Sequence, residues 1–281
     1  MNQLDPFTRK TFKAGKFQED HLPKRLTPNL KDALLDKYKR GKRRLILLDY
    51  DGTIVPFTKR PEDAKPDEEI LSLLTLLTRD ARNEVVIVSG RGKEFLDECF
   101  RGMWLGIVAE HGAWIKEKGG EWRLVRELDN QWKMHIRPIM EQYVEATPGS
   151  LIEEKSFSLV WHYRGADPKV SVLKLRELID VLSRLAPVLK VDVIAGNKYV
   201  EARSSGVSKG LAALHWLSKE NWDFVLAMGD DTTDEEMFAA LPSSAYSVKV
   251  GLSPSRARFA VESVEEARLL IGEMVRASQV A

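Results

Sequence analysis

Short apolar runs that end in polar or acidic residues constrain the fold of this chain most. They read RLILLDY at 44–50, EVVIVSGR at 84–91, WLGIVAEHG at 104–112 and DFVLAMGDD at 223–231. Their apolar residues are contiguous, which is typical of strands buried on both faces, and no run is long enough to cross a bilayer. Helical leucine patterns separate the runs, as at 67–80. This repetition predicts an α/β core, a parallel sheet with helices on both faces.

The pattern changes after Gly112, where one hairpin pattern begins a mixed stretch and a second hairpin pattern closes it. Strand and helix patterns alternate between the two hairpins, which predicts an α+β block inserted within the core. We therefore predict three parts: an N-terminal arm and helix at 1–43, a core at 44–113 and 203–281, and the insert at 114–202.

Two acidic clusters follow apolar runs of the predicted sheet. Asp49 and Asp51 come directly after LILL, with Gly52 permitting a sharp exit, and Asp230 opens an acidic group after FVLAM. Ligands of parallel sheets bind at the carboxyl ends of the strands, so we expect these acids to meet there. Gathered acids repel one another and lose hydration, and Mg²⁺ relieves both costs. Either acid alone could be a turn or capping residue, but two clusters together predict a magnesium site.

Two further residues lie between these clusters in the sequence. Ser89 closes the run VVIV, and Lys209 begins a helical pattern in GVSKG. A hydroxyl and an ammonium can both bind phosphate oxygens. Each residue alone is more often a cap or a solvated side chain, so the order of the four motifs is what carries the prediction.

That order, Asp-x-Asp, Ser, Lys, Gly-Asp-Asp, resembles the haloacid-dehalogenase-like phosphatases over most of residues 44–270. The resemblance implies a Rossmann-like core with an inserted cap domain. It also implies that Asp49 is the nucleophile that forms an aspartyl-phosphate, and that Asp51 is the general acid and then the base. Ser89 and Lys209 would bind the transferring phosphoryl group. Physically, a carboxylate that attacks phosphate needs its repulsion cancelled by nearby positive charge.

The resemblance further implies a set of metal-binding residues. Asp230, the carboxylate of Asp49 and the main-chain carbonyl of Asp51 would hold Mg²⁺. Asp231 or Asp234 would bind the waters of the metal and orient them. Asp230 and Asp231 are both possible direct ligands by sequence, and we choose Asp230.

Longer strings resemble a narrower family, the trehalose-6-phosphate phosphatases. They are DYDGTIVPF, VSGR, AEHGAW, EEKSFSLVWHYR, NKYVEARSSGVSKG and GDDTTDEEMF. The resemblance covers almost all of 44–240 and implies a phosphatase of trehalose biosynthesis. Two places depart from it, since Ala109 stands where the family usually has Gly, and residues 202–204 read Ala-Arg-Ser in place of Val-Arg-Pro.

The substrate-binding residues follow from this resemblance and from the chemistry of a disaccharide. Trehalose presents many hydroxyls, which ionised acids and lysines bind well. Glu201 and Lys155 in the insert are therefore the first candidates. Glu110 and His111, at the crossing from core to insert, come next, followed by Arg91.

His162 and Arg164 alternate along one predicted strand, so we expect them on the same face. They could line the substrate site or brace the insert. Trp161 should point to the opposite face, into the core of the insert.

Composition limits the other classes of function. The formal net charge is +1, which argues against a nucleic-acid partner. Cys99 is the only cysteine, and no signal or transmembrane pattern occurs, so we expect a cytoplasmic enzyme that does not bind a membrane. The junction before Asp49 is similar to that of fused synthase–phosphatase proteins, which raises association with a trehalose-6-phosphate synthase as a hypothesis.

Two alternatives remain open on sequence. The substrate could be another sugar phosphate, such as sucrose 6-phosphate or mannosylglycerate phosphate, because only the insert would differ. The chain could also be a catalytically silent regulatory domain of a trehalose synthase system. Asp49, Asp51, Lys209 and Asp230 are all present, which favours activity.

Overall fold

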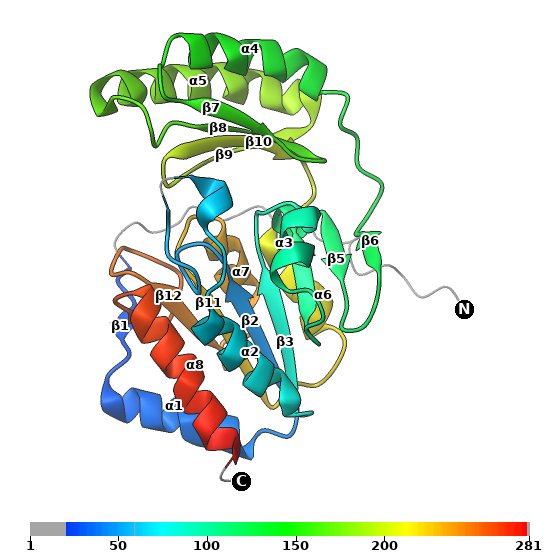
Figure 1. The fold of residues 1–281 in the computed structure, drawn as a ribbon, viewed down its shortest axis with the longest axis vertical. Coiled ribbons are helices and arrows are strands. Elements are labelled where there is room, and N and C mark those ends of the chain that lie inside the picture. Colours follow the sequence, from blue (N-terminus) through cyan, green and yellow to red (C-terminus); the bar gives the residue numbers. More distant parts are fainter. Residues whose placement is uncertain (1–20, 59, 280–281) are drawn as a thin grey trace. The chain divides into compact units, whose positions relative to one another are not determined.

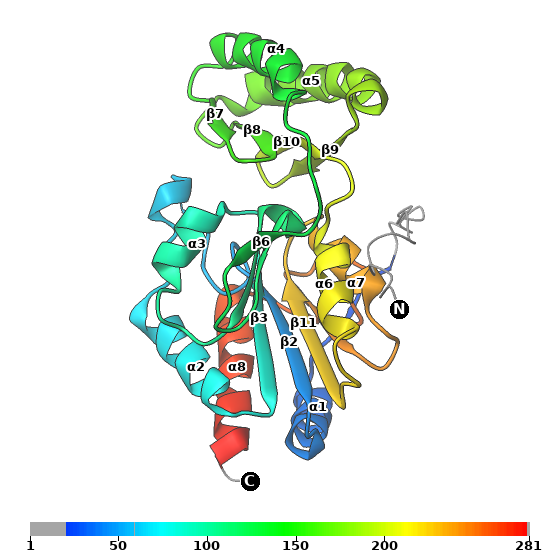
Figure 2. The ribbon, with the colours of Figure 1, turned by 90° about the vertical axis from the view of Figure 1, so that its right-hand side faces the viewer.

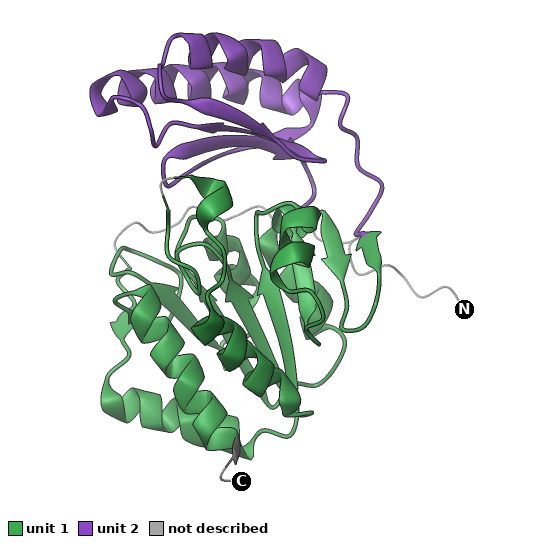
Figure 3. Cartoon of the chain, viewed as in Figure 1, with its two compact units in different colours: residues 1–123, 208–281 green, residues 124–207 purple. Residues whose placement is uncertain are grey.

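The computed structural model describes residues 21–58 and 60–279, so the first 20 residues of the predicted N-terminal arm and helix lie outside the described residues. The chain divides into two compact units (Figure 3). We call residues up to 123 together with 208–281 the core unit, and residues 124–207 the insert.

A nine-stranded sheet forms the centre of the core unit (Figure 1). Its strands are, in spatial order, β1 (Lys24–Arg25), β13 (Phe259–Val261), β12 (Tyr246–Val250), β11 (Phe224–Gly229), β2 (Arg44–Asp49), β3 (Asn83–Val88), β4 (Gly106–Ala109), β5 (Trp114–Lys116) and β6 (Trp122–Leu124). Neighbours from β1 to β4 run parallel, whereas β5 runs antiparallel to β4. The chain moves from β2 to β3 and β4 on one side, and returns through β11 to β13 on the other. The strand order therefore reverses between β2 and β11, which is where parallel sheets bind ligands.

Helices cover both faces of this sheet, as the sequence predicts (Figure 2). They are α1 (Pro28–Arg40), α2 (Glu68–Arg79), α3 (Lys93–Cys99), α6 (Lys209–Leu217), α7 (Asp234–Ala240) and α8 (Val264–Gln279). Helix α8 packs against α1 and α2 on one face, and α6 packs against α7 on the other. This arrangement confirms the α/β prediction.

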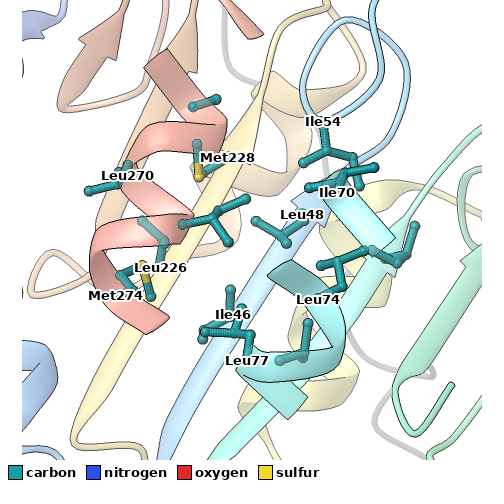
Figure 4. Packing of buried hydrophobic residues seen from close by; sticks show 14 of the residues in the cluster. Ile46, Leu48, Ile54, Ile70, Leu74, Leu77, Leu226, Met228, Leu270 and Met274 are labelled. Carbon is teal, nitrogen blue, oxygen red and sulfur yellow. The ribbon is translucent and has the colours of Figure 1, made fainter. Parts of the chain in front are cut away.

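The apolar runs are contiguous because both faces of each strand are buried. Ile46 and Leu48 of β2 pack under α2 and α8, against residues such as Leu74 (Figure 4). Leu45 and Leu47 point the other way and are equally buried, with 0% exposure. Side chains of β2 thus pack into apolar layers on both faces of the sheet. This packing fixes the position of the strand, and with it the position of Asp49 at its end.

The insert is a separate α+β unit with a second, antiparallel sheet, again as predicted. Its sheet order is β7 (Leu151–Glu154), β8 (Ser158–His162), β10 (Tyr199–Ser204) and β9 (Val191–Gly196). The helices are α4 (Lys133–Glu145) and α5 (Pro168–Leu189). Trp161 of β8 is fully buried in the cluster that α4 and α5 form with one face of the sheet. The other face carries polar side chains.

The boundary of the insert differs from the predicted range of 114–202. The hairpin of β5 and β6 extends the large sheet of the core unit, since Ile115 pairs with Val108 and is fully buried. A hairpin pattern in the sequence does not say which sheet the hairpin joins.

In the part of the chain that the structure describes, no helix is long and apolar enough to span a membrane.

Candidate active site

The site lies at the carboxyl ends of β2 and β11, where the strand order reverses. Asp49 is the last residue of β2, and Asp230 follows Gly229 at the end of β11. Gly52 has a φ of +77°, and a Cβ there would come within 2.3 Å of the Asp230 carboxylate. The sharp turn after Asp49 therefore brings the two acidic segments into direct contact.

Lys209 links the acids of this site. Its ammonium donates to Oδ1 of Asp49 at 2.6 Å and to Oδ1 of Asp234 at 2.8 Å. The Lys209 side chain is 3% exposed, and a lysine so buried requires negative partners. The other oxygen of Asp234 accepts the N–H groups of Asp230 and Asp231, both at 3.0 Å. Asp234 thus ties the first turn of α7 to α6 and to the end of β11.

The negative charge of the clustered carboxylates exceeds the positive charge that Lys209 supplies. Burial and the charge of Asp234 raise the pKa of Asp49 to about 7, although Lys209 opposes the shift. Burial and the charge of Asp49 raise the pKa of Asp230 to about 9. Burial alone would lower the pKa of Lys209, but Asp234 and Asp49 outweigh it and raise it. Further positive charge is therefore needed to hold both Asp49 and Asp230 as carboxylates near neutral pH.

The residues present fit a hard divalent cation. Oxygens of Asp49, Asp230 and Asp234 lie within 4.8 Å of one another. Oδ1 of Asp230 is buried and has no hydrogen-bond partner among the described residues. Mg²⁺ prefers oxygen ligands, and a carboxylate oxygen without a hydrogen-bond partner is available to bind it. Water and phosphate oxygens would complete the coordination shell. Asp231 is outside this group of three, and its Oδ1 accepts the N–H of Thr232 at 2.7 Å.

Asp51 is held by Arg91, a contact that sequence reasoning did not foresee. Arg91 donates to both oxygens of Asp51, at 2.7 and 2.6 Å, and to the carbonyl of Pro61 at 2.7 Å. Its guanidinium also lies 4.8 Å from the ring centre of Phe95. The sequence names Arg91 as a candidate for binding the substrate, and in the structure its guanidinium contacts the predicted general acid.

Two hydroxyls complete the loops around Asp49. Ser89 follows β3 and is 1% exposed, and its Oγ accepts the N–H of Arg91 at 3.1 Å. Thr53 donates to Oδ2 of Asp49 at 2.9 Å. We did not single out Thr53 from the sequence, although its place four residues after Asp49 in the DxDGT string was a usable signal.

Glu110 and His111 lie in a buried turn after β4 with unusual backbone geometry. Their φ angles are 48° and 54°, and a non-glycine residue in this region costs about 1–2 kcal/mol. The N–H of His111 donates to the carbonyl of Ser89, and the N–H of Glu110 to that of Arg91, both at 2.9 Å. Gly90 faces the imidazole, since a Cβ on Gly90 would come within 2.4 Å of it. The turn is therefore built against the Ser89 loop.

Glycine at position 112 ends this turn against the segment that carries Lys209. Gly112 has a φ of +112°, and a Cβ there would come within 2.8 Å of the carbonyl of Ser208. Ser208 caps α6, because its Oγ accepts the N–H of Leu211 at 3.0 Å. The glycine of the Glu-His-Gly string is thus explained by its close backbone contact with the start of α6.

The candidate sugar-binding residues of the insert share the face of its sheet that lacks helices. The Lys155 ammonium lies 3.8 Å from Glu201 Oε1 and 3.9 Å from Glu153 Oε2. Glu153 also contacts Nε2 of His162 at 2.8 Å. Glu153 was missed from the sequence, although its spacing of two from Lys155 places both on one face.

Arg164 departs from the expected position. Strand β8 ends at His162, and Arg164 lies in the turn that follows. Its guanidinium donates to the carbonyl of Asn197 at 2.9 Å, across to the turn between β9 and β10. The alternation of His162 and Arg164 on one strand therefore does not hold, because the strand is shorter than its sequence pattern.

Comparison with known proteins identifies the family. The family model of trehalose-phosphatase matches residues 47–266. The chain belongs to the trehalose-phosphatase family. A bifunctional trehalose-6-phosphate synthase/phosphatase of Thermoproteus tenax is 42% identical over 243 residues, which are 86% of this chain and 33% of the relative. The trehalose-phosphatase of Saccharomyces cerevisiae is 35% identical over 246 residues, covering 79% of this chain and 28% of the relative. This chain thus spans about a third of the length of these relatives.

One solved structure is similar to this chain over nearly all of its own length. The C-terminal domain of C. albicans trehalose-6-phosphate phosphatase superposes with a TM-score of 0.86 and 30% sequence identity. The match covers 91% of this chain and 98% of that domain. The fold, insert included, is therefore that of a trehalose-phosphatase domain.

Proposed function

We propose that this chain is a magnesium-dependent phosphatase that hydrolyses trehalose 6-phosphate to trehalose and phosphate. The main support is the meeting of Asp49, Asp230, Asp234 and Lys209 at the strand-order reversal of a trehalose-phosphatase domain. A silent regulatory domain would not need a nucleophilic carboxylate, a buried lysine and an orphaned acid oxygen kept together at such electrostatic cost.

Asp49 and Asp51 divide the chemistry in two steps. First, an Asp49 oxygen bonds to phosphorus as the bond from phosphorus to the sugar oxygen breaks, and Asp51 gives that oxygen a proton. Asp51, now a carboxylate, then takes a proton from water, whose oxygen bonds to phosphorus as the bond to Asp49 breaks. Arg91 donates to both oxygens of Asp51, so its guanidinium also fixes the orientation of the carboxyl group that passes the proton.

Positive charge and orientation supply the rest of the catalysis. Lys209 restrains Asp49 and offers its ammonium to the phosphoryl oxygens, and Ser89 is the candidate hydroxyl donor to the same group. Asp49, Asp230 and the carbonyl of Asp51 would hold Mg²⁺, which when bound neutralises the carboxylates and the charge that develops on phosphate. Asp234 keeps Lys209 and the Asp230 segment in place.

Recognition of trehalose is assigned to the helix-free face of the insert and to the turn after β4. Glu201 and Lys155 are the leading candidates for hydroxyl contacts, because ionised groups form the stronger hydrogen bonds. Glu110, His111 and His162 are further candidates. Arg164, in the turn after β8, is also proposed as a substrate contact. The names of the relatives support trehalose 6-phosphate over other sugar phosphates.

Phosphate release from a panel of sugar phosphates tests this proposal. The panel holds trehalose 6-phosphate, sucrose 6-phosphate, mannosylglycerate phosphate and glucose 6-phosphate at equal concentration with Mg²⁺. We expect the highest kcat/KM for trehalose 6-phosphate. Faster turnover of another member would replace the substrate, and no turnover of any member would favour the regulatory alternative.

Association with a trehalose-6-phosphate synthase is a separate part of the proposal. One relative carries both names, synthase and phosphatase, in a single chain. Co-purification of this chain with a synthase, with and without residues 1–40, tests the idea. Binding that survives the deletion would exclude residues 1–40 as the contact.

A further inference from the structure

Lys249 is a buried lysine beside the candidate metal site to which the sequence gave no role. It lies near the end of β12, paired in register with Gly229 of β11, and is 4% exposed. Its ammonium donates to the main-chain carbonyl of Asp230. A lysine is rarely buried unless its ammonium has a hydrogen-bond or charged partner. Here the ammonium donates to the backbone of a candidate metal ligand.

The peptide groups flanking Asp230 are held from two sides. Its N–H donates to Asp234 at 3.0 Å, and its carbonyl accepts from Lys249. The Asp230 carboxylate itself lies against Gly52, with Oδ1 unpartnered among the described residues. Because no described side chain donates a hydrogen bond to that oxygen, we infer that the main-chain hydrogen bonds of Asp230 orient its carboxylate.

Glu235 is the acidic partner of Lys249. Its Oε1 lies 4.0 Å from the Lys249 ammonium and accepts the hydroxyl of Ser255 at 2.7 Å. Its Oε2 accepts the N–H of Arg256 at 2.6 Å. Glu235 is in the first turn of α7, so the lysine connects α7, β12 and the Asp230 segment in one buried network.

We propose that Lys249 is a positioning residue that orients Asp230 for binding Mg²⁺. This inference rests on the metal assigned under the proposed function. Two effects of the lysine oppose each other: its positive charge repels a nearby cation, whereas its hydrogen bond fixes a ligand of that cation. Positioning is the larger effect, because the charge is compensated by Glu235 and the hydrogen bond acts directly on Asp230.

The sign of the change in Mg²⁺ affinity tests this inference. Lys249→Met removes both the charge and the hydrogen bond. We expect the dissociation constant for Mg²⁺, measured by calorimetry without substrate, to rise about 10- to 100-fold, as when outer partners of metal ligands are lost. Turnover should recover largely at saturating Mg²⁺, since the ligands remain. An unchanged or lower dissociation constant overturns the inference.

A matched control is available in the insert. Lys133 is also buried, at 8% exposure, and donates to the main-chain carbonyl of Lys155. Lys133→Met should leave the Mg²⁺ dissociation constant unchanged, and an equal weakening there would overturn the inference by showing a general effect of losing a buried lysine.

Three further outcomes are informative. If Lys249→Met does not fold, Lys249→Gln keeps a polar group that is one atom too short, and the expected weakening has the same sign. Wild-type protein that binds no Mg²⁺ would overturn the metal part of the proposed function and this inference together. Wild-type binding with unchanged variants would overturn this inference alone.

Discussion

The core unit and the insert hold their charged residues in different ways. In the core unit, Lys209 contacts Asp49 and Asp234 at 2.6 and 2.8 Å, and the three side chains are 3%, 5% and 0% exposed. In the insert, Lys155 lies 3.8 Å from Glu201, on one face of a sheet. The first group is fixed by direct hydrogen bonds, whereas Lys155 and Glu201 lie beyond hydrogen-bond distance of each other although their side chains are only 10% and 1% exposed.

This difference teaches how one domain combines fixed chemistry with adjustable recognition. Desolvated charges in contact interact strongly and are costly to rearrange, which suits a phosphoryl-transfer centre that works by positioning. Charges held at longer distances, as in the insert, can exchange partners with sugar hydroxyls at lower cost. Changes in the core unit should therefore affect every substrate, and changes in the insert only particular substrates.

The largest expected effect is loss of the nucleophile. Asp49→Asn keeps the size of the side chain but removes the charge that attacks phosphorus. We expect kcat to fall on the order of 10⁴-fold or more for trehalose 6-phosphate and for a simple aryl phosphate alike. Phosphate release measures both. Retained turnover of either substrate would contradict the covalent mechanism.

Removal of the cation should have the next largest effect. Chelation is expected to lower turnover on the order of 10³-fold, because several kcal/mol of charge stabilisation are lost. Added Mg²⁺ should restore it and also raise Tm in proportion to its binding, by mass action. Asp230→Asn should abolish that rise in Tm. Activity that is indifferent to the chelator would contradict the magnesium assignment.

The sequence predicted the core unit better than the insert, for physical reasons. Strands buried on both faces leave contiguous apolar runs, so β2 and β11 and the acids after them could be placed with the strand order unknown. Arg91, by contrast, meets Asp51 through folding of a loop near Pro61, and no spacing encodes this. Arg164 was misplaced because residues 155–164 read as one strand, whereas β8 stops at His162.

Lys249 is a contact within the core unit that the sequence also did not predict. It lies in a run that reads as an ordinary strand, and its contact with Asp230 depends on the register between β12 and β11. Register between two strands that a helix separates in the chain is not written in either strand alone.

A change in the insert should be selective for substrate. Glu201→Gln preserves shape but weakens hydrogen bonds from hydroxyls, at about 1.5–3 kcal/mol for a charged partner. We expect KM for trehalose 6-phosphate to rise roughly 10- to 100-fold, with aryl phosphate turnover unchanged. Glu145→Gln, on the exposed side of α4, is the control and should change neither. Equal loss on both substrates would place Glu201 in the chemistry instead of recognition.

The smallest effect expected is on stability in acid, at the opposite end of β2. Burial alone would raise the pKa of Asp80, but hydrogen bonds from Arg82 and the charge of Arg44 outweigh it and lower the pKa to about 2. A carboxyl whose pKa falls on folding adds stability above its unfolded pKa of about 4. That stability is lost as pH falls from about 4 to about 2.

Denaturant unfolding of Asp80→Asn at pH 6 and pH 3 checks this prediction. We expect the variant to be about 1 kcal/mol less stable at pH 6, with a smaller difference at pH 3. Asp180→Asn, an exposed acid on α5 of the insert, should match wild type at both pH values. A pH-dependent loss of the same size in both variants would mean that tight pairing in the core unit does not set the acid stability, and would remove the contrast between the two units on this point.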